Sequence, residues 1–262
     1  MSASLHMETQ GQGPDLLLLH GWGLHGGVWD TLMPELTPHL RVTRVDLAGH
    51  GRSRAVCMPH SLTELTLQTM AGVPPGAVVL GWSLGGLVAL EAALRMPQRL
   101  RGLILANTTP RFVTAEDWAC AMPPEQLRGF AEGLAQDYPE TLRRFLSLQV
   151  RGDESARASL RQLRDSLFTH GEPDTASLAT GLDLLKDTDL RLKLQDISVP
   201  TLVLAGGHDR LTPAGASEYL AGHIPGARLE AFPKSAHAPF ISHAEAFVAA
   251  VLGFMDKVEK AA

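Results

Sequence analysis

The sequence Gly-Trp-Ser-Leu-Gly at residues 81–85 constrains the fold of this chain more than any other segment. It lies between an apolar run at residues 77–80 and a helical pattern of apolar residues that begins at Leu84. A serine between two glycines at such a junction predicts a sharp turn from a strand into a helix, which holds the serine in strained geometry and exposes its hydroxyl. We therefore predict that Ser83 is a nucleophile placed to attack carbonyl groups.

Short apolar runs elsewhere predict the sheet to which this turn belongs. They have few polar interruptions, which is typical of strands buried on both faces, and helix-length segments between several of them favour parallel pairing. The runs occupy residues 16–19, 42–47, 77–80, 103–106, 201–205 and 227–232. The predicted fold class is α/β, with a mostly parallel central sheet flanked by helices.

One helix is predicted before the turn and one after it. Ser61-Leu62-Thr63-Glu64 fits a capping box, in which the serine and glutamate side chains bond the free backbone donors of a helix start. After Ser83, apolar residues at helical spacing predict a buried helix that Pro97 ends. Those residues are Leu84, Leu87, Val88, Ala92 and Leu94.

The segment after Asn107 breaks the alternation of strands and helices and is far longer than an ordinary loop. Four helical patterns are expected in it, opened by Pro123-Pro124, Pro139, Ser155 and Pro173, with the last ending near Lys186. We predict an all-helical lid at residues 112–185, inserted into a core of residues 1–111 and 186–262.

Composition excludes several classes of protein. The 262 residues are 45% hydrophobic and carry a net charge of −5, which disfavours general nucleic-acid binding because that requires a basic surface. No secretory signal or membrane-length apolar run is visible, so a cytoplasmic protein without membrane association is expected. Cys57 and Cys120 are too few for a disulfide framework. We expect a monomer that needs no metal and no organic cofactor.

A serine hydroxyl needs a histidine to accept its proton and a carboxylate to orient that histidine. Asp209 directly follows the predicted strand at 201–205, where a side chain projects beyond the carboxyl edge of the sheet. His237 follows the run at 227–232 in a turn of small residues. Other acidic residues near the strand at 201–205 come before it and fit the role poorly; they are Asp187, Asp189 and Asp196. Other histidines fit loops or a helix start; they are His208, His223 and His243. We predict that Asp209 and His237 complete a triad with Ser83.

The negative oxygen of a tetrahedral intermediate needs two preorganised donors. The backbone N–H of Leu84 is one candidate, and the N–H of Trp22 in His20-Gly21-Trp22-Gly23, directly after the first apolar run, is the other. His20 is expected to shape this loop. Residues 46–53 also follow a strand, but their glycines lack the spacing of a phosphate-binding loop, so a structural turn is expected there.

Together these residues resemble the α/β-hydrolase superfamily and, more closely, the BioH-type esterases that cleave the methyl ester of pimeloyl-acyl carrier protein in biotin synthesis. The resemblance spans nearly the whole chain. It is carried by residues 20–24, 81–88, 145–149 and 236–243. It implies catalytic roles for Ser83, Asp209 and His237. It also implies substrate contacts at Trp22, Ser83, Leu84, Phe145, Leu146, Ser147, Leu148, Gln149 and His237. Packing of the lid on the core is the alternative role for residues 145–149.

A local excess of arginine lies in the predicted lid, at Arg143, Arg144, Arg151, Arg157, Arg161 and Arg164. Helical spacing places the last three on one face, which suits an acidic carrier protein or its phosphopantetheine phosphate; a solvated helix face is the alternative. The resemblance implies carrier contacts at Arg144, Arg157 and Arg161. It also leads us to expect a basic residue one turn before Arg144, where this chain has Glu140, so Arg143 is predicted to compensate.

The sequence thus predicts a serine carboxylesterase that releases methanol and free pimeloyl-acyl carrier protein. A short-chain carboxylesterase and a carbon–carbon bond hydrolase on the same scaffold remain open, because the same triad serves both. A non-catalytic ligand sensor is a third alternative. Epoxide hydrolases and dehalogenases are disfavoured, since they carry an aspartate where this chain has Ser83.

Overall fold

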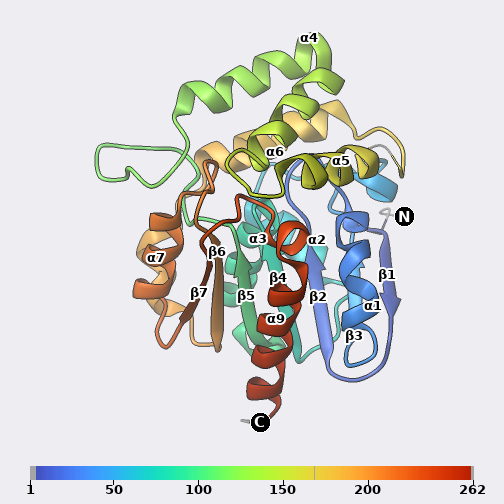
Figure 1. Ribbon diagram of the computed structural model, residues 1–262, viewed down its shortest axis with the longest axis vertical. Coiled ribbons are helices and arrows are strands. Elements are labelled where there is room, and N and C mark those ends of the chain that lie inside the picture. Colours follow the sequence, from blue (N-terminus) through green and yellow to red (C-terminus); the bar gives the residue numbers. More distant parts are fainter. Residues whose placement is uncertain (1–3, 168, 261–262) are drawn as a thin grey trace.

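A seven-stranded sheet forms the centre of the molecule (Figure 1). The computed structural model describes residues 4–167 and 169–260, so both chain ends of the predicted core lie outside the described residues. The strand order is β1-β3-β2-β4-β5-β6-β7, with β1 antiparallel to β3 and the other neighbours parallel. The strands are β1 (Met7–Gln10), β2 (Asp15–Leu19), β3 (Arg41–Val45), β4 (Ala77–Trp82), β5 (Leu100–Ala106), β6 (Thr201–Gly206) and β7 (Arg228–Phe232).

The apolar runs found in the sequence correspond to β2 through β7, and the predicted α/β class, with a mostly parallel sheet flanked by helices, is confirmed. The edges of the sheet differ from expectation. The polar strand β1 was not predicted, and it pairs with β3 along one edge. The expected burial of β7 on both faces is wrong, because only Phe232 of this strand is buried. β7 lies at the opposite edge and has one neighbouring strand, so most of its side chains face solvent.

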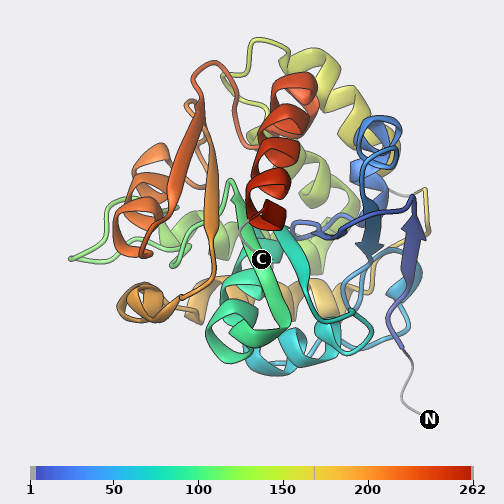
Figure 2. The ribbon, with the colours of Figure 1, turned by 90° about the horizontal axis from the view of Figure 1, so that it is seen from below.

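Helices cover both faces of the sheet. Figure 2 shows α1 and α9 over one face and α2 and α3 over the other. The core helices are α1 (Met33–Leu36), α2 (Leu62–Met70), α3 (Leu84–Arg95), α7 (Ala214–His223), α8 (Pro239–Ser242) and α9 (Ala244–Lys260). Short 3-10 helices join them at η1 (Gly26–Leu32), η2 (Gly51–Ser53), η3 (Pro97–Arg99) and η4 (Arg191–Asp196). Helix α3 is buried over nearly its full length and ends before Pro97, as the sequence predicts.

The start of α2 is correctly placed, but the predicted capping box is not formed. Ser61 occupies the N-cap position and its side chain makes no capping hydrogen bond. The Thr63 hydroxyl of the first turn donates instead to Glu91 on α3, at 2.7 Å. The local sequence therefore places the start of α2 correctly, but the Ser61 side chain does not cap the helix.

Among the described residues, the long segment between β5 and β6 holds the α-helices α4 (Pro124–Gln149), α5 (Ala156–Ser166) and α6 (Thr175–Asp187). They gather at the end of the sheet where the parallel strands terminate (Figure 1). The first two predicted helices merge into α4, although Asp137 leaves helical geometry two residues before Pro139. No helix within residues 4–167 and 169–260 is long and apolar enough to cross a membrane. We continue to propose residues 112–185 as the lid.

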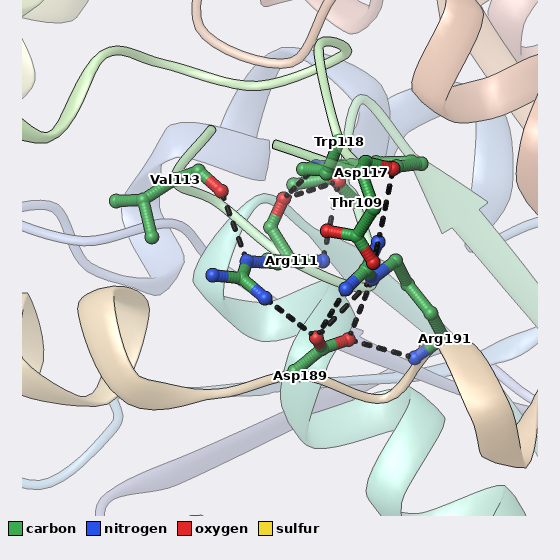
Figure 3. A network of polar contacts seen from close by, with 7 residues as sticks. All are labelled: Thr109, Arg111, Val113, Asp117, Trp118, Asp189 and Arg191. Atoms are coloured by element: carbon green, nitrogen blue, oxygen red, sulfur yellow. Dashed lines mark hydrogen bonds and ion pairs between the residues drawn. The ribbon is translucent and has the colours of Figure 1, made fainter. Parts of the chain in front are cut away.

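A charged network joins the chain entering these helices to the chain leaving them (Figure 3). Arg111, just after β5, bonds Asp189, just after α6, at 2.9 Å. Arg191 contacts Asp189 at 2.8 Å and Asp117 at 3.0 Å, and its guanidinium lies over the Trp118 ring at 5.4 Å. The two connections are therefore tied to each other beside the sheet.

The network predicts a pH-dependent contribution of Asp189 to stability. Hydrogen bonds from Arg191, and then from Arg111, lower the pKa of Asp189 from 3.8 to about 2. A carboxylate with a lowered pKa stabilises the fold above its ordinary pKa, and this contribution is lost as the pH falls from 3.8 towards 2. After discounting for solvent screening, we expect Asp189→Asn to cost about 1 kcal/mol at pH 7 and less at pH 3.

Urea unfolding of both proteins from pH 7 to pH 3 measures this difference. Asp256→Asn is the control, because within the described residues that exposed carboxylate pairs only with Lys260, one turn away on α9. The control is expected to change stability by less than about 0.5 kcal/mol. A loss for Asp189→Asn that is the same at pH 3 as at pH 7 would contradict the electrostatic cause.

Candidate active site

Ser83 lies between β4 and α3 in the left-handed backbone conformation, with φ 56° and ψ −118°. This conformation is strained for a residue with a side chain, so the surrounding structure must hold it. The Ser83 N–H donates to Ala106 O at 3.2 Å, and the Thr108 hydroxyl donates to Ser83 O at 2.8 Å. The predicted strand-to-helix turn is present, and β5 and the residues after it brace it.

Gly85 lets the start of α3 approach the end of β2. A Cβ atom at this position would lie 2.5 Å from Leu19 O and 2.7 Å from His20 O. Both are backbone atoms of the central sheet and its following loop, so neither can move aside easily. The glycine after the nucleophile is therefore required by close packing, and it brings the loop at residues 20–23 next to Ser83.

Asp209 and His237 meet beyond the ends of β6 and β7. His237 Nδ1 lies 2.7 Å from Asp209 Oδ2, and the two side chains are 1% and 0% exposed. Within the described residues, His237 Nε2 is buried and has no hydrogen-bond partner. An ionised carboxylate at Nδ1 keeps the proton on that nitrogen, which leaves Nε2 as the basic one.

The Asp209 carboxylate accepts hydrogen bonds on both oxygens. Oδ1 accepts from the N–H groups of Leu211 and Thr212 at 2.8 and 3.0 Å. Oδ2 accepts from the Thr212 hydroxyl at 2.6 Å and from Asn107 Nδ2 at 2.7 Å. Burial raises the pKa of Asp209, but His237 and the hydrogen bonds from Asn107 and Thr212 outweigh it and hold the pKa below 3.8. Asp209 therefore stays ionised at neutral pH.

Trp82 connects the serine turn to the histidine loop. Its indole N–H donates to His237 O at 2.8 Å, and its ring lies 5.4 Å from the imidazole between centroids. Ser83 follows directly in the chain, although no hydrogen bond joins its hydroxyl to His237 Nε2. Catalytic hydrogen bonds of this kind often form only in the complex with substrate. The structure thus brings the three predicted catalytic residues to one place.

Two buried histidines shape the loop that holds Trp22. His20 Nε2 accepts from the Leu47 N–H at 2.9 Å, and His50 Nε2 accepts from the Gly23 N–H at 3.1 Å. Burial lowers the pKa of His20 to about 3 and that of His50 to about 4, so both are neutral acceptors. This agrees with the expectation that His20 shapes the loop.

The two predicted oxyanion donors keep their backbone N–H groups available. Leu84 is the first residue of α3, so its N–H has no partner inside the helix. Within the described residues, the N–H of Trp22 also donates no hydrogen bond to another backbone group. The Trp22 indole N–H donates to Leu178 O of α6 at 2.8 Å, which anchors this side chain to the lid.

The lid segment at residues 145–149 faces in two directions. Phe145 and Leu146 are buried, and Phe145 packs edge-on against Trp22 with 4.9 Å between ring centroids. Gln149 O accepts from the His237 N–H at 2.9 Å, and Gln149 Oε1 is buried with no partner among the described residues. Ser147 and Leu148 instead line an outer groove of about 580 Å³, with Phe130, Arg144, Arg151, Glu125, Gln126 and Gly129.

The lid also contacts the loops that carry the base and the acid, through residues that the sequence did not suggest. Asp153 Oδ2 accepts from the Ala236 N–H at 3.1 Å, and Gly152 O lies 2.7 Å from His208 Nδ1. Asn107, Thr108 and Thr212 were likewise missed. Asn107 and Thr108 bond residues that are 102 and 25 positions away, so no local pattern could have revealed them. Thr212 bonds Asp209 from three positions further along the same loop.

The arginines predicted to dock a carrier differ in their surroundings. Arg143 lies 3.5 Å from Glu140, so part of its charge is met within the lid. Arg144 lines the outer groove. Arg157 and Arg161 are exposed on α5, and neither makes an ion pair within the described residues. Among the described arginines of this group, unpaired positive charge therefore lies on Arg144 and Arg151 beside the groove and on α5.

The polar residues around Asp46 have a structural role. Asp46 accepts from the Gly26 N–H at 2.7 Å and the Arg52 N–H at 2.8 Å, which makes residues 46–53 a braced turn, as predicted. Across residues 4–167 and 169–260, no group of three or more His, Cys, Asp or Glu side chains is arranged to hold a metal ion.

Comparison with known proteins places these features in context. Residues 14–244 match the family described as the alpha/beta hydrolase fold. The chain is 46% identical over 246 residues to a pimeloyl-[acyl-carrier protein] methyl ester esterase of Nitrosomonas europaea, covering 94% of this chain and 97% of the relative. It is 44% identical over 254 residues to a protein of the same name from Xanthomonas oryzae, covering 97% and 100%. An esterase structure from Exiguobacterium antarcticum superposes with a TM-score of 0.88 at 24% identity, covering 96% of this chain and 95% of that one, and shows the fold alone.

The packing at Gly85 predicts an unequal effect of two glycine-to-alanine changes. Gly85→Ala forces α3 away from the backbone of β2, and overpacking of this kind costs about 1–3 kcal/mol. Gly253 lies on α9, where an added Cβ meets no atom within 4 Å. Gly253→Ala is therefore expected to stabilise the protein by about 0.5–1 kcal/mol.

The test measures the thermal stability of each variant and the reactivity of its Ser83. Gly85→Ala is expected to lower both, because the turn that holds Ser83 shifts with the helix. Gly253→Ala is expected to leave the reactivity of Ser83 unchanged. Equal stability of the two variants would contradict the close approach of α3 and β2.

Proposed function

Because this chain belongs to the α/β-hydrolase fold family, we propose that it is a serine carboxylesterase with Ser83, His237 and Asp209 as its catalytic residues. One observation carries the proposal. A buried, ionised Asp209 holds His237 with a free Nε2, beside a serine in a strained strand-to-helix turn. This arrangement suits acyl transfer through a covalent acyl-enzyme.

In the proposed reaction, His237 Nε2 accepts the Ser83 proton as Oγ attacks the ester carbonyl. The N–H groups of Trp22 and Leu84 then hold the oxyanion, a contribution worth about 10²–10³ in rate per donor in well-studied hydrolases. His237 returns the proton to the leaving alkoxide, which departs as methanol. Water activated by the same nitrogen attacks the acyl-enzyme, and Ser83 recovers its proton as the carboxylate leaves.

We further propose that the substrate is the methyl ester of pimeloyl-acyl carrier protein and that the products are methanol and the free pimeloyl-carrier protein, as a step of biotin synthesis. The names of the relatives support this assignment. The lid supports it too, because exposed arginines on α5 and at Arg144 suit the phosphate and acidic surface of a carrier. Residues 145–149 and Trp22 are the proposed substrate contacts.

Two further properties belong to the same proposal. We propose a monomer that acts in the cytoplasm, where acyl groups are carried as thioesters on the carrier. Light scattering of the purified protein tests the first property, and cell fractionation tests the second. A stable dimer or a membrane-bound fraction would contradict them.

Active-site labelling tests the nucleophile. A fluorophosphonate probe is expected to label the wild type and Ser217→Ala, a buried serine of α7, but not Ser83→Ala. Esterase kcat/KM is expected to fall by about 10⁴-fold or more in Ser83→Ala, because the nucleophile is lost while the fold remains. A wild type that binds ligands tightly yet resists the probe would instead support a sensor.

Charge reversal tests the carrier. Arg157→Glu with Arg161→Glu is expected to lower kcat/KM on the carrier-linked methyl ester by about tenfold or more at low salt, with less effect at high salt. The rate on a free short-chain methyl ester is expected to stay the same. Arg228→Glu is the matched control, because Arg228 begins β7 at the end of the sheet away from the lid.

Methanol release from synthetic pimeloyl-carrier methyl ester is the measurement. No turnover of the carrier-linked ester, together with rapid turnover of short esters, would replace this substrate with a general carboxylesterase role. Equal losses on both substrates in the arginine variants would show that α5 affects the lid and not carrier docking.

A further inference from the structure

Asn107 lies between the two loops that carry the proposed acid and base. It follows β5 directly, its N–H donates to Leu204 O at 2.9 Å, and its backbone is left-handed with φ 41°. Its side chain is almost fully buried, at 1% exposure. Nδ2 donates to Asp209 Oδ2 at 2.7 Å and to Ala236 O at 3.1 Å. One amide group therefore contacts both loops.

The orientation of this amide follows from its partners. A carboxylate oxygen and a carbonyl oxygen both accept hydrogen bonds, so the atom between them must be the nitrogen. Gly206 at the end of β6 leaves space for this nitrogen, because a Cβ atom at that position would lie only 2.9 Å from Asn107 Nδ2. The Asn107 Oδ1 atom is buried and has no partner among the described residues. The site thus satisfies the donor end of the amide and leaves the acceptor end unmet.

We propose that Asn107 is a positioning residue of the catalytic triad, which fixes Asp209 against His237 and moderates the charge on Asp209 Oδ2. The inference rests on the proposed esterase function. Asn107 contacts neither Ser83 nor the bond to be cleaved, so its effect passes through Asp209 and through the carbonyl that precedes His237.

The electrostatic part of this role follows from which oxygen is shared. Oδ2 accepts from Asn107 and also faces His237 Nδ1. Without the amide, more negative charge on Oδ2 faces the imidazole and stabilises its protonated form. Beside this pair, Asp153 of the lid bonds the Ala236 N–H, and His208 and Arg210 flank Asp209 in the chain. Loss of the donor is therefore expected to move the acid limb of the pH–rate profile to higher pH.

A purely structural role for Asn107 makes a different prediction. Asparagine, aspartate and glycine all tolerate the left-handed backbone, and aspartate matches the shape of asparagine. If shape alone matters, Asn107→Asp will resemble the wild type. If the donor matters, Asn107→Asp will be worse than Asn107→Gly at neutral pH, because it places a second negative charge against Asp209.

The experiment measures kcat, KM and the pH dependence of kcat/KM on a short-chain ester for the wild type, Asn107→Gly and Asn107→Asp. We expect kcat of Asn107→Gly to fall about tenfold with little change in KM, and the acid limb to move to higher pH. Asn107→Asp is expected to lose more. Thr109→Val is the matched control, because the Thr109 hydroxyl bonds Arg111 O in the same segment and contacts neither Asp209 nor His237.

Circular dichroism and thermal unfolding establish that each variant is folded; should Asn107→Asp not fold, Asn107→Gly alone decides the result through its pH profile. If Asn107→Gly shows an unchanged kcat and an unchanged acid limb, the inference about Asn107 is wrong. The proposed esterase function still stands in that case, because the wild type is active. A lower rate with an unmoved acid limb, shared by Thr109→Val, also overturns the inference about Asn107. An inert wild type overturns the proposed function and this inference with it.

Discussion

The left-handed turn at Ser83 is the constraint on which the rest of the site depends. A residue with a side chain is strained at φ 56°, and contacts with neighbouring segments keep Ser83 in this conformation. Ala106 and Thr108 bond its backbone from β5 and the residues after it, and Gly85 lets α3 press against the end of β2. The same contacts that hold the turn bring the Trp22 loop and the segment at residues 107–109 to the serine. The contacts that fix the conformation of the nucleophile therefore also fix the positions of the loops around it.

The parts of this arrangement that the sequence predicted are those that follow from a parallel sheet. Buried strands leave long apolar runs, and parallel strands end at one edge, so polar residues after β4, β6 and β7 had to converge. Asp209 and His237 were predicted by that argument, and Ser83 was predicted from the glycine-flanked turn at residues 81–85. Edges and caps were less predictable because they depend on neighbours. The exposure of β7 follows from its lack of a second partner, and the Thr63 hydroxyl of α2 found Glu91 on another helix.

Contacts between distant loops could not be predicted at all. Asn107 reaches Asp209 across 102 positions of the chain, and Asp153 reaches Ala236 across 83. Neither residue type is unusual where it stands, and each carries a role only because two loops meet. Their chemistry is nevertheless specific. Asn107 supplies a donor to the buried acid and to Ala236 O, and Asp153 supplies an acceptor to the Ala236 N–H, so both backbone groups of the residue before His237 are paired.

The lid contributes to the base as well as to substrate contacts. The carbonyl of Gln149 and the carboxylate of Asp153 accept the N–H groups of His237 and Ala236. Leu148, one residue before Gln149, lines the outer groove with Arg144 and Arg151. Helix α4 ends at Gln149, so this residue closes the helix that lines the groove and also supplies the carbonyl that accepts from the His237 N–H. The outer groove and the backbone contact to the base therefore belong to one short segment of the lid.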